Sequence, residues 1–557
     1  MKYFRLLADR RLAQLVVAIA LAASPAAWAA PAAWNPAFAD TVRVAWGQVG
    51  AIDNLDPGTA RGVPNWRLVM ETYETLAHFP DGATEPQPLL AESFRRLEGG
   101  RIWEFRLRRG IKFTTGSEVT AEAVRYSIDR AMEIGLGAIF PLEGLYERTE
   151  VVDQYTVRFH LRASSLAWPC IVANPVILGI IDPQFVQRNG GITRGRRNDY
   201  VSTHTAGTGP FILEDLRANQ RVTFKRNPDY WRGWSNRPRL ERVVIQIVPE
   251  ESTRLLLIER GDVDIAEIGA TALPGLKQRI RAQSLPLAVV ERDASGRPLP
   301  SLSMMWINMN NKMAPTSDIN VRKGLAHSFN YDQFIKQVLN GYARRARTIV
   351  PSGSSCYMPD APAYEYDLNK AKAAFAEASP DAQRGLRDGL VFRYQQDYVV
   401  QREGALMWQA DLAKIGVNLR IEEVDAATWL RFTRTPPGAP LLEARWFGSY
   451  PDAEYFMHPY RTGYWPPVGF GASYAGNAET DAMIDAARTA GTMEQRCNLY
   501  RRIATRFYNE AALLLIAEVD GAIHPFNVQA NWVRGFVYNP ATTAPSVFYP
   551  MSKQAPR

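Results

Sequence analysis

Residues 391–422, VFRYQQDYVVQREGALMWQADLAKIGVNLRIE, decide the fold class of this chain. The stretch opens on the apolar strand pattern of 391–395 and continues into a helical pattern. That helix places four apolar side chains on one face, Ala405, Trp408, Leu412 and Ile415. Gly416 ends the helix, and residues 417–422 then alternate apolar and polar side chains as a strand does. This order predicts a βαβ unit and therefore a mixed α/β fold.

The same mixture of patterns extends outward through the chain. Trp103, Phe105 and Leu107 alternate with polar residues, and 155–161 alternate likewise, so each predicts a strand with one wet face. Between them, a helix is predicted to begin at Thr120, whose hydroxyl can cap it. The length of 557 residues suggests about three domains of ordinary size.

The first 39 residues predict a secretory signal peptide. A basic start precedes a dozen apolar residues, 12–23, a run too short to span a bilayer. Small-residue cleavage sites follow at 27–29 and 37–39, so cleavage is expected between Ala29 and Asp40. The alternative is an N-terminal membrane anchor. A lipid anchor is excluded because no cysteine lies near these sites.

The charge and the cysteines exclude several partners. The formal charge of +8 includes four basic residues and one acidic residue in the leader, so its removal leaves about +5. The remaining Lys and Arg are scattered, which argues against a nucleic-acid track. The three cysteines, Cys170, Cys356 and Cys497, are too far apart for a metal knuckle and predict buried thiols with at most one disulfide.

Motifs for covalent or metal chemistry are missing from the sequence. The six histidines never fall at i and i+4, and no G-x-x-x-x-G-K or G-x-G-x-x-G loop occurs. The nearest approach to a nucleophile elbow, GASYA at 471–475, lacks its last glycine. The sequence therefore predicts a protein that binds and releases, with no enzyme activity, cofactor or metal.

Several stretches, in order, resemble the large solute-binding proteins of peptide- and nickel-type ABC importers, the family 5 extracellular solute-binding proteins. They include GTGPF at 207–211, RNPDYWRG at 226–233, INMNN at 307–311, WFGSYPDAEYF at 446–456 and VRGFVYNP at 533–540. The resemblance covers nearly all of residues 40–545.

This resemblance implies a two-lobed, three-domain periplasmic-binding-protein fold that closes by a hinge. Domain I would be discontinuous, with residues 40–72, 205–299 and 518–557. Domain II would be an insertion of 73–204, and domain III would span 300–517. The hinges are expected near Pro300 and Asp520.

The resemblance also implies a function. The chain would be a periplasmic monomer that captures a small solute, most simply a peptide or peptide-like molecule, and delivers it to an inner-membrane permease. The alternatives are an opine, an oligosaccharide or a metal chelate as ligand, or, from another class, a secreted hydrolase with an aromatic-lined cleft.

In peptide-binding relatives, a domain III strand pairs with the ligand, and an Asp at its end takes the ligand's α-ammonium. The strand resembles residues 441–449 here, and Ser449 occupies the Asp position. Asp452 is one candidate to replace the missing charge. The position of the dipeptide binders' carboxylate-binding Arg is Gln395, with Arg393 and Arg402 as candidate substitutes.

Further candidates for the ligand site come from the same resemblance. Trp446, Phe447 and Tyr450 either stack on a ligand or belong to the domain III core. The loop that contains Asn54 and Asp56 either lines the cleft or is an ordinary Asp-Pro turn. Tyr474 is expected in a domain III loop that faces the cleft. Asn308 either forms a hydrogen bond with the ligand between the lobes or caps the end of a strand.

Overall fold

The structure is a computed structural model that describes residues 34–555, except for 48–50, 81–82, 138, 235–239, 292–301, 397, 470, 520–525 and 537–547. The basic and apolar parts of the predicted leader lie outside the described residues, as do both expected hinges, Pro300 and Asp520. Within the described part of the chain, no helix is long and apolar enough to cross a membrane.

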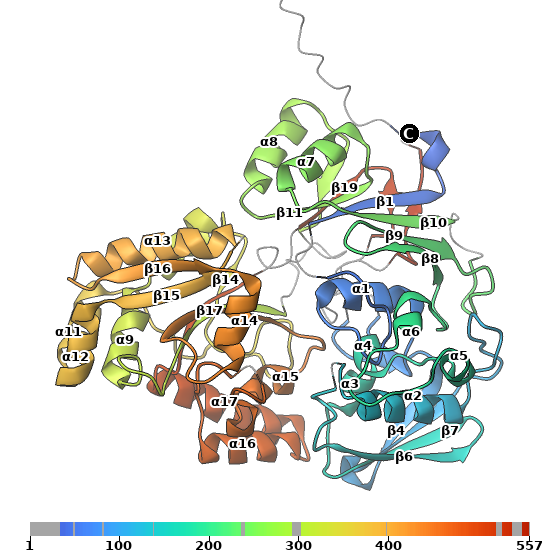
Figure 1. Ribbon diagram of the computed structural model, residues 1–557, viewed down its shortest axis with the longest axis horizontal. Helices are drawn as coiled ribbons and strands as arrows, with labels where there is room; N and C mark the ends of the chain where they lie inside the picture. The colour runs from blue at the N-terminus through green and yellow to red at the C-terminus, as the bar shows by residue number, and fades with distance from the viewer. Residues whose placement is uncertain are drawn as a thin grey trace, which may run out of the picture.

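A seven-stranded sheet forms the upper part of the first lobe (Figure 1). Its order is β12-β19-β11-β1-β10-β9-β8. β1 is parallel to β10 and β11, and the remaining pairs are antiparallel. Helices α1 (Val63–Thr72), α7 (Glu251–Arg260) and α8 (Leu273–Ala282) belong to this part. The strands are β1 (Thr41–Trp46), β8 (Phe211–Arg217), β9 (Arg221–Arg226), β10 (Arg242–Ile247), β11 (Ile265–Ile268), β12 (Leu287–Val289) and β19 (Phe526–Ala530).

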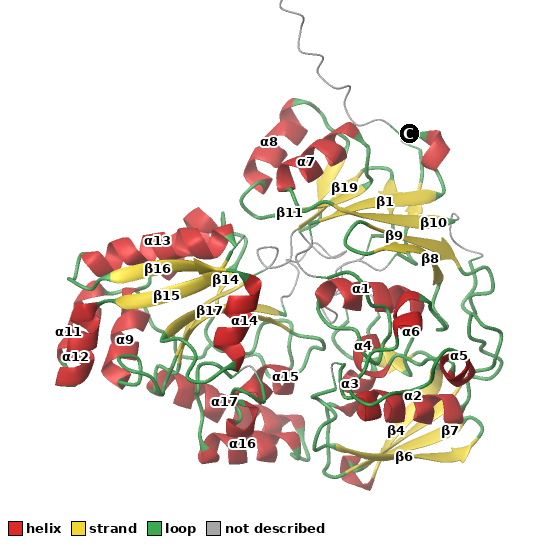
Figure 2. Ribbon diagram, viewed as in Figure 1, coloured by secondary structure: helices red, strands yellow, loops and turns green. Residues whose placement is uncertain are grey.

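A four-stranded antiparallel sheet forms the lower part of the first lobe (Figure 2). It consists of β4 (Ala91–Leu97), β5 (Ile102–Leu107), β7 (Thr156–Leu161) and β6 (Tyr146–Asp153). Helix α2 (Ala121–Ile134) packs against β6 and β7. The hydroxyl of Thr120 accepts a hydrogen bond from the backbone N–H of Ala123 at 3.4 Å. The two strands and the helix cap predicted from sequence here are confirmed.

A six-stranded mixed sheet, ordered β14-β18-β13-β17-β15-β16, forms the second lobe. The βαβ unit predicted for 391–422 is confirmed, because β15 and β16 are parallel and α13 (Val399–Ala413) joins them. Gly416 follows α13 with a φ of +78°, the left-handed conformation expected of a helix stop. The strands are β13 (Ser303–Met309), β14 (Arg344–Arg345), β15 (Leu390–Gln395), β16 (Leu419–Val424), β17 (Leu441–Phe447) and β18 (Leu513–Glu518).

Helices cover both faces of this six-stranded sheet. One core gathers apolar side chains from β13, β15, α9 (Ile319–Ser328), α11 (Leu368–Ala376), α12 (Pro380–Asp388) and α13. The other face packs against α15 (Ala453–Met457), α16 (Ala478–Arg488) and α17 (Met493–Asn509). Helix α14 (Ala426–Arg434) lies on the side of the second lobe that faces α1 (Figure 1). The α/β fold class and the two-lobed architecture are therefore confirmed.

A disulfide joins Cys356 to Cys497 across 141 residues and ties the loop after β14 to α17. Cys170 keeps a free, half-buried thiol. The sequence allowed at most one disulfide, and the fold supplies the partner by bringing two distant cysteines within a Cα–Cα distance of 4.9 Å.

We predict that the double substitution Cys356→Ala, Cys497→Ala lowers the free energy of unfolding of the second lobe by about 3–5 kcal/mol. The lost cross-link frees a long loop in the unfolded chain. Urea unfolding monitored by circular dichroism measures the change. The control Cys170→Ala, which breaks no cross-link, is expected to cost about 1 kcal/mol or less. Equal effects of the two substitutions would contradict the prediction.

Candidate functional site

The end of β17 lies where the two lobes touch. Ser449 is 1% exposed, and its backbone carbonyl accepts a hydrogen bond from the side-chain amide of Asn174 in the first lobe. Its hydroxyl lies 3.0 Å from the hydroxyl of Tyr455. Sequence reasoning missed Asn174 and Tyr455. The position at which the family resemblance predicts an Asp is therefore a buried, uncharged hydrogen-bonding site at the lobe interface.

Asp452 does not offer a spare carboxylate, so the expectation that it replaces the missing Asp is corrected. Its side chain caps the first turn of α15, and both its oxygens bind the guanidinium of Arg496, at 2.6 and 2.7 Å. Ser355 donates a further hydrogen bond at 3.0 Å. A carboxylate whose lone pairs are already used inside the protein cannot also hold a ligand's ammonium group.

A cavity of about 320 Å³ on one face of the six-stranded sheet contains two of the predicted residues, Asn308 and Trp446. In the pairing of β13 with β17, Trp446 lies opposite Met304 and Asn308 lies opposite Leu442. Because every second residue of a strand points to the same face of the sheet, Asn308 and Trp446 share this face. The Asn308 side-chain oxygen accepts a hydrogen bond from the indole of Trp306 at 2.8 Å. The remaining lining is Trp306, Ile349, Phe456, Pro459, Tyr460, Gly471 and Ser473.

Three other aromatic residues were predicted at the site, and the structure gives each of them different surroundings. Tyr474 follows the lining residue Ser473 and has a φ of +50°, an uncommon conformation for a side chain of this size. Its buried hydroxyl makes no hydrogen bond within the described part of the chain. Phe447 ends β17 opposite Ser303. Tyr450 is 1% exposed and packs edge-on against Tyr455 at 5.0 Å, so it belongs to the core and not to a stacking surface.

The predicted loop residues of the first lobe hold that loop together. The Asn54 side chain donates to Thr59 at 3.1 Å and accepts from the backbone N–H of Asp56 at 3.0 Å. Asp56 is fully buried, and Arg130 of α2 binds both its oxygens at 2.7 and 2.5 Å. The polar groups of Asn54 and Asp56 are therefore used inside the loop, which favours the alternative of an ordinary Asp-Pro turn.

Gln395, at the end of β15, accepts a hydrogen bond from the guanidinium of Arg445 at 2.9 Å. The candidate substitutes Arg393 and Arg402 instead pair with Glu422 at 2.8 Å and Glu403 at 3.4 Å. Sequence reasoning missed Arg445, although the alternation of β17 places its side chain on the face opposite Trp446. The cation beside Gln395 therefore comes from the neighbouring strand.

Aromatic side chains of the two lobes pack against each other near Ser449. The ring of Phe140 in the first lobe lies 5.2 Å from that of Tyr455 and 5.5 Å from that of His458. Burial lowers the pKa of His458 to about 3, and the nearby Arg488 and Arg461 act in the same direction. His458 therefore stays neutral in this contact at physiological pH.

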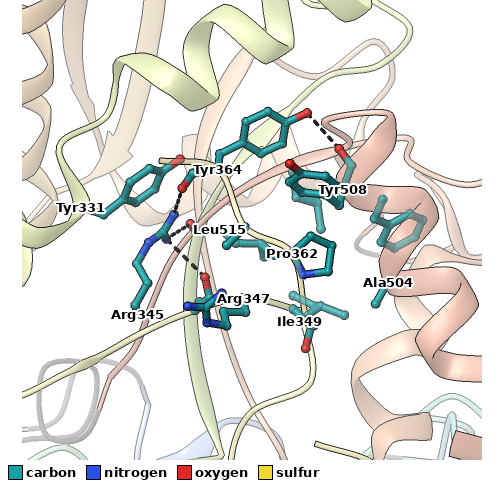
Figure 3. A pocket seen from close by; sticks show the side chains of 14 residues that line it. Tyr331, Arg345, Arg347, Ile349, Pro362, Tyr364, Ala504, Tyr508 and Leu515 are labelled. Atoms are coloured by element: carbon teal, nitrogen blue, oxygen red, sulfur yellow. Dashed lines mark hydrogen bonds between the residues drawn. The ribbon is translucent and has the colours of Figure 1, made fainter. Parts of the chain in front are cut away.

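A second cavity, of about 460 Å³, lies on the same sheet face beside β14 and β18, and Ile349 lines both hollows (Figure 3). Its polar groups bind one another, because Arg345 donates to the carbonyls of Tyr364 and Leu515, each at 2.7 Å. The Tyr364 hydroxyl donates to the carbonyl of Tyr508 at 2.9 Å. Aromatic and apolar side chains make up most of the lining, and two arginines, Arg345 and Arg347, complete its polar part. Arg347 donates to the carbonyl of Ala361 at 3.0 Å.

Residues 85–466 match the family described as "Bacterial extracellular solute-binding proteins, family 5 Middle". The chain belongs to this family. The matched region covers more than half of the protein and includes the whole of β13, β15, β16 and β17. The resemblance inferred from sequence motifs is confirmed.

Relatives of this solute-binding protein are binding proteins. The "Probable D,D-dipeptide-binding periplasmic protein DdpA" of Escherichia coli K12 is 27% identical over 508 residues, which cover 89% of this chain and 91% of the relative. The Helicobacter pylori periplasmic binding protein DppA, solved with the peptide STSA, has a TM-score of 0.76 and 21% identity over 92% of this chain and 98% of its own. MoaA from A. tumefaciens R10, solved with mannopinic acid, has a TM-score of 0.76 and 23% identity over 92% and 99%.

We predict that Arg496→Leu lowers the free energy of unfolding of this solute-binding protein by about 3–5 kcal/mol, because it leaves buried Asp452 without its counter-ion. Urea unfolding provides the measurement. The control Arg501→Leu lies on the same helix but loses only an exposed pair with Asp360 at 3.2 Å, which is expected to cost about 1 kcal/mol or less. A loss from Arg496→Leu no larger than the control's would contradict this reading of the pair.

Proposed function

We propose that this protein is the periplasmic receptor of an ABC importer, which captures a small peptide or peptide-like solute between its lobes and delivers it to an inner-membrane permease. The observation that carries the proposal is the hydrogen bond from Asn174 to the carbonyl of Ser449, which joins the lobes at the end of the predicted docking strand. Contacts between the two lobes stabilise the closed form. A ligand that adds contacts to both lobes therefore shifts the population toward the closed form.

The three-domain division supports this mechanism as part of the proposal. The strands of the seven-stranded sheet come from within 40–72, 205–299 and 518–557, and the four-stranded sheet lies within 73–204. All strands of the six-stranded sheet lie within 300–517 except the last residue of β18, Glu518. Domains I and II then form the first lobe and domain III the second, with chain crossings near Pro300 and Asp520.

Export by a cleaved leader is also proposed, and contacts near the start of the described chain favour the earlier cleavage site. Trp34 packs edge-on against Trp532, with ring centroids 6.3 Å apart. The ammonium group of Lys553 donates to the carbonyl of Phe38 at 2.7 Å. Cleavage after Ala29 keeps both contacts, whereas cleavage after Ala39 removes them, and the intact mass of the exported protein distinguishes the two.

The ligand is proposed to be peptide-like, with its amino end either modified or bound elsewhere. The relative named for D,D-dipeptides supports the peptide-like class. Around Ser449, the described side chains within hydrogen-bonding reach are neutral. An ammonium group enclosed there would lose its hydration without gaining an anion, which costs several kcal/mol.

Small-angle scattering tests the proposed receptor mechanism. Mass spectrometry first identifies the solute that co-purifies, and unfolding and refolding then remove it. We expect the stripped protein to have a larger radius of gyration and the re-addition of that solute to restore the compact form. A verified ligand that produces no compaction would sink the closure mechanism.

We predict that Ser449→Asp improves the binding of ligands with a free amino terminus about tenfold or more, because a charge-assisted hydrogen bond replaces a neutral one. Thermal-shift titration with the dipeptide Met-Leu and with N-acetyl-Met-Leu measures the effect. The acetylated peptide is the matched control and should gain nothing. If both peptides respond alike, β17 is not the strand that binds the ligand's amino end.

A further inference from the structure

We propose that Arg445 binds a carboxylate group of the transported solute. This inference rests on the proposed receptor function and specifies the chemistry that the second lobe recognises. Arg445 lies on β17, four residues before Ser449, and has no counterpart among the residues expected at the site from sequence.

The Arg445 guanidinium is held rigidly by its neighbours. It donates to the carboxylate of Glu443 at 3.0 Å and to the side-chain oxygen of Gln395 at 2.9 Å. Its central carbon lies 3.4 Å from the ring centroid of Tyr398 and 5.6 Å from that of Trp429 on α14. A cation fixed by two hydrogen bonds and two aromatic rings loses little further freedom when a ligand binds.

This guanidinium still has hydrogen-bonding capacity. Arginine carries five N–H donors, and the described residues claim two of them here. The Nε–H makes no hydrogen bond to the described residues, and each Nη atom has a second N–H besides the one it donates, so donors remain for a carboxylate. Other paired arginines differ, because the side chains of Arg130 and Arg496 are 1% exposed and enclosed by protein, whereas that of Arg445 is 10% exposed.

The position of Arg445 suits ligand contact. β15 and β17 are parallel, so Gln395 and Arg445 lie at the carboxyl ends of neighbouring strands. Ligands of open α/β sheets bind outside this end. The same end of β17 leads to Ser449, which contacts Asn174 of the first lobe. A solute that lies across the end of the sheet can therefore meet Arg445 from one side and the first lobe from the other.

The net charge of the Arg445–Glu443 pair favours a carboxylate over a phosphate. Glu443 is 2% exposed and already partly neutralises Arg445. Burial raises the pKa of Glu443, and the Arg445 guanidinium opposes that rise. A doubly charged phosphate would be repelled by Glu443 at close range, whereas a planar, singly charged carboxylate can accept from the remaining N–H donors with less repulsion.

The test uses propionate as the probe, with propionamide as its uncharged counterpart, and the full mature chain. Nuclear magnetic resonance follows the indole N–H of Trp429, assigned by its loss in Trp429→Phe. We expect a saturable shift with propionate and none with propionamide. In Arg445→Gln the propionate dissociation constant should rise about tenfold or more. The variant Arg393→Gln, which loses a pair with Glu422 on the same sheet, should bind as the wild type does.

Two outcomes overturn the proposal: a Trp429 signal that does not move with propionate, and an affinity that Arg445→Gln leaves unchanged. The double variant Arg445→Gln, Glu443→Gln removes both charges together, so a loss of affinity in it does not come from an isolated buried glutamate. Failure of the receptor function appears separately, as absence of compaction in scattering, because propionate binding to the second lobe requires no closure.

Discussion

The buried pairing of Asp452 with Arg496 holds together the part of the molecule where the lobes meet. Arg496 on α17 also contacts Glu454 at 3.2 Å, and Glu454 in turn accepts from Arg488 on α16 at 2.5 Å. Arg488 reaches the carbonyl of Pro141 in the first lobe at 3.2 Å. Two carboxylates and two guanidiniums therefore neutralise one another in a place that water scarcely reaches. Buried charges of this kind are tolerated only when all partners are present, so three helices are fixed in one arrangement behind the end of β17.

Two kinds of charged residue lie near the end of β17: those paired inside the protein and one, Arg445, that keeps unused hydrogen-bond donors. Asp452 and Glu454, which follow β17 in sequence, pair with arginines inside the protein, and the hydroxyl groups of Ser449 and Tyr455 near the end of β17 are neutral. On the opposite face of the same strand, Arg445 is oriented by Gln395 and Glu443 and retains donors. In the proposed site, the end of the strand is therefore polar and nearly uncharged, and an oriented cation lies on the strand's other face. Specificity in such a site comes from unmatched hydrogen-bonding groups that a wrong ligand leaves unpaired.

Local sequence patterns predicted many of the helices and strands. They could not predict which side chains pair when the two residues are far apart in the sequence. The βαβ unit of 391–422 is specified by its own periodicity and its stop at Gly416, so it could be read directly. Asp452 looked like a spare carboxylate because its partner, Arg496, lies 44 residues further on. Cys356 and Cys497 are 141 residues apart. Arg445 became a candidate only when strand pairing placed it against Gln395, 50 residues earlier.

The order in which the strands of the seven-stranded sheet are made has a consequence for biogenesis. β19, near the end of the chain, pairs with both β11 and β12, and it is the one described strand that pairs with β12. Lys553 adds a contact with buried Asp264 at 3.0 Å. The sheet that begins at residue 41 therefore cannot be completed until synthesis passes residue 530. Such non-local pairing delays folding until nearly the whole chain has been made.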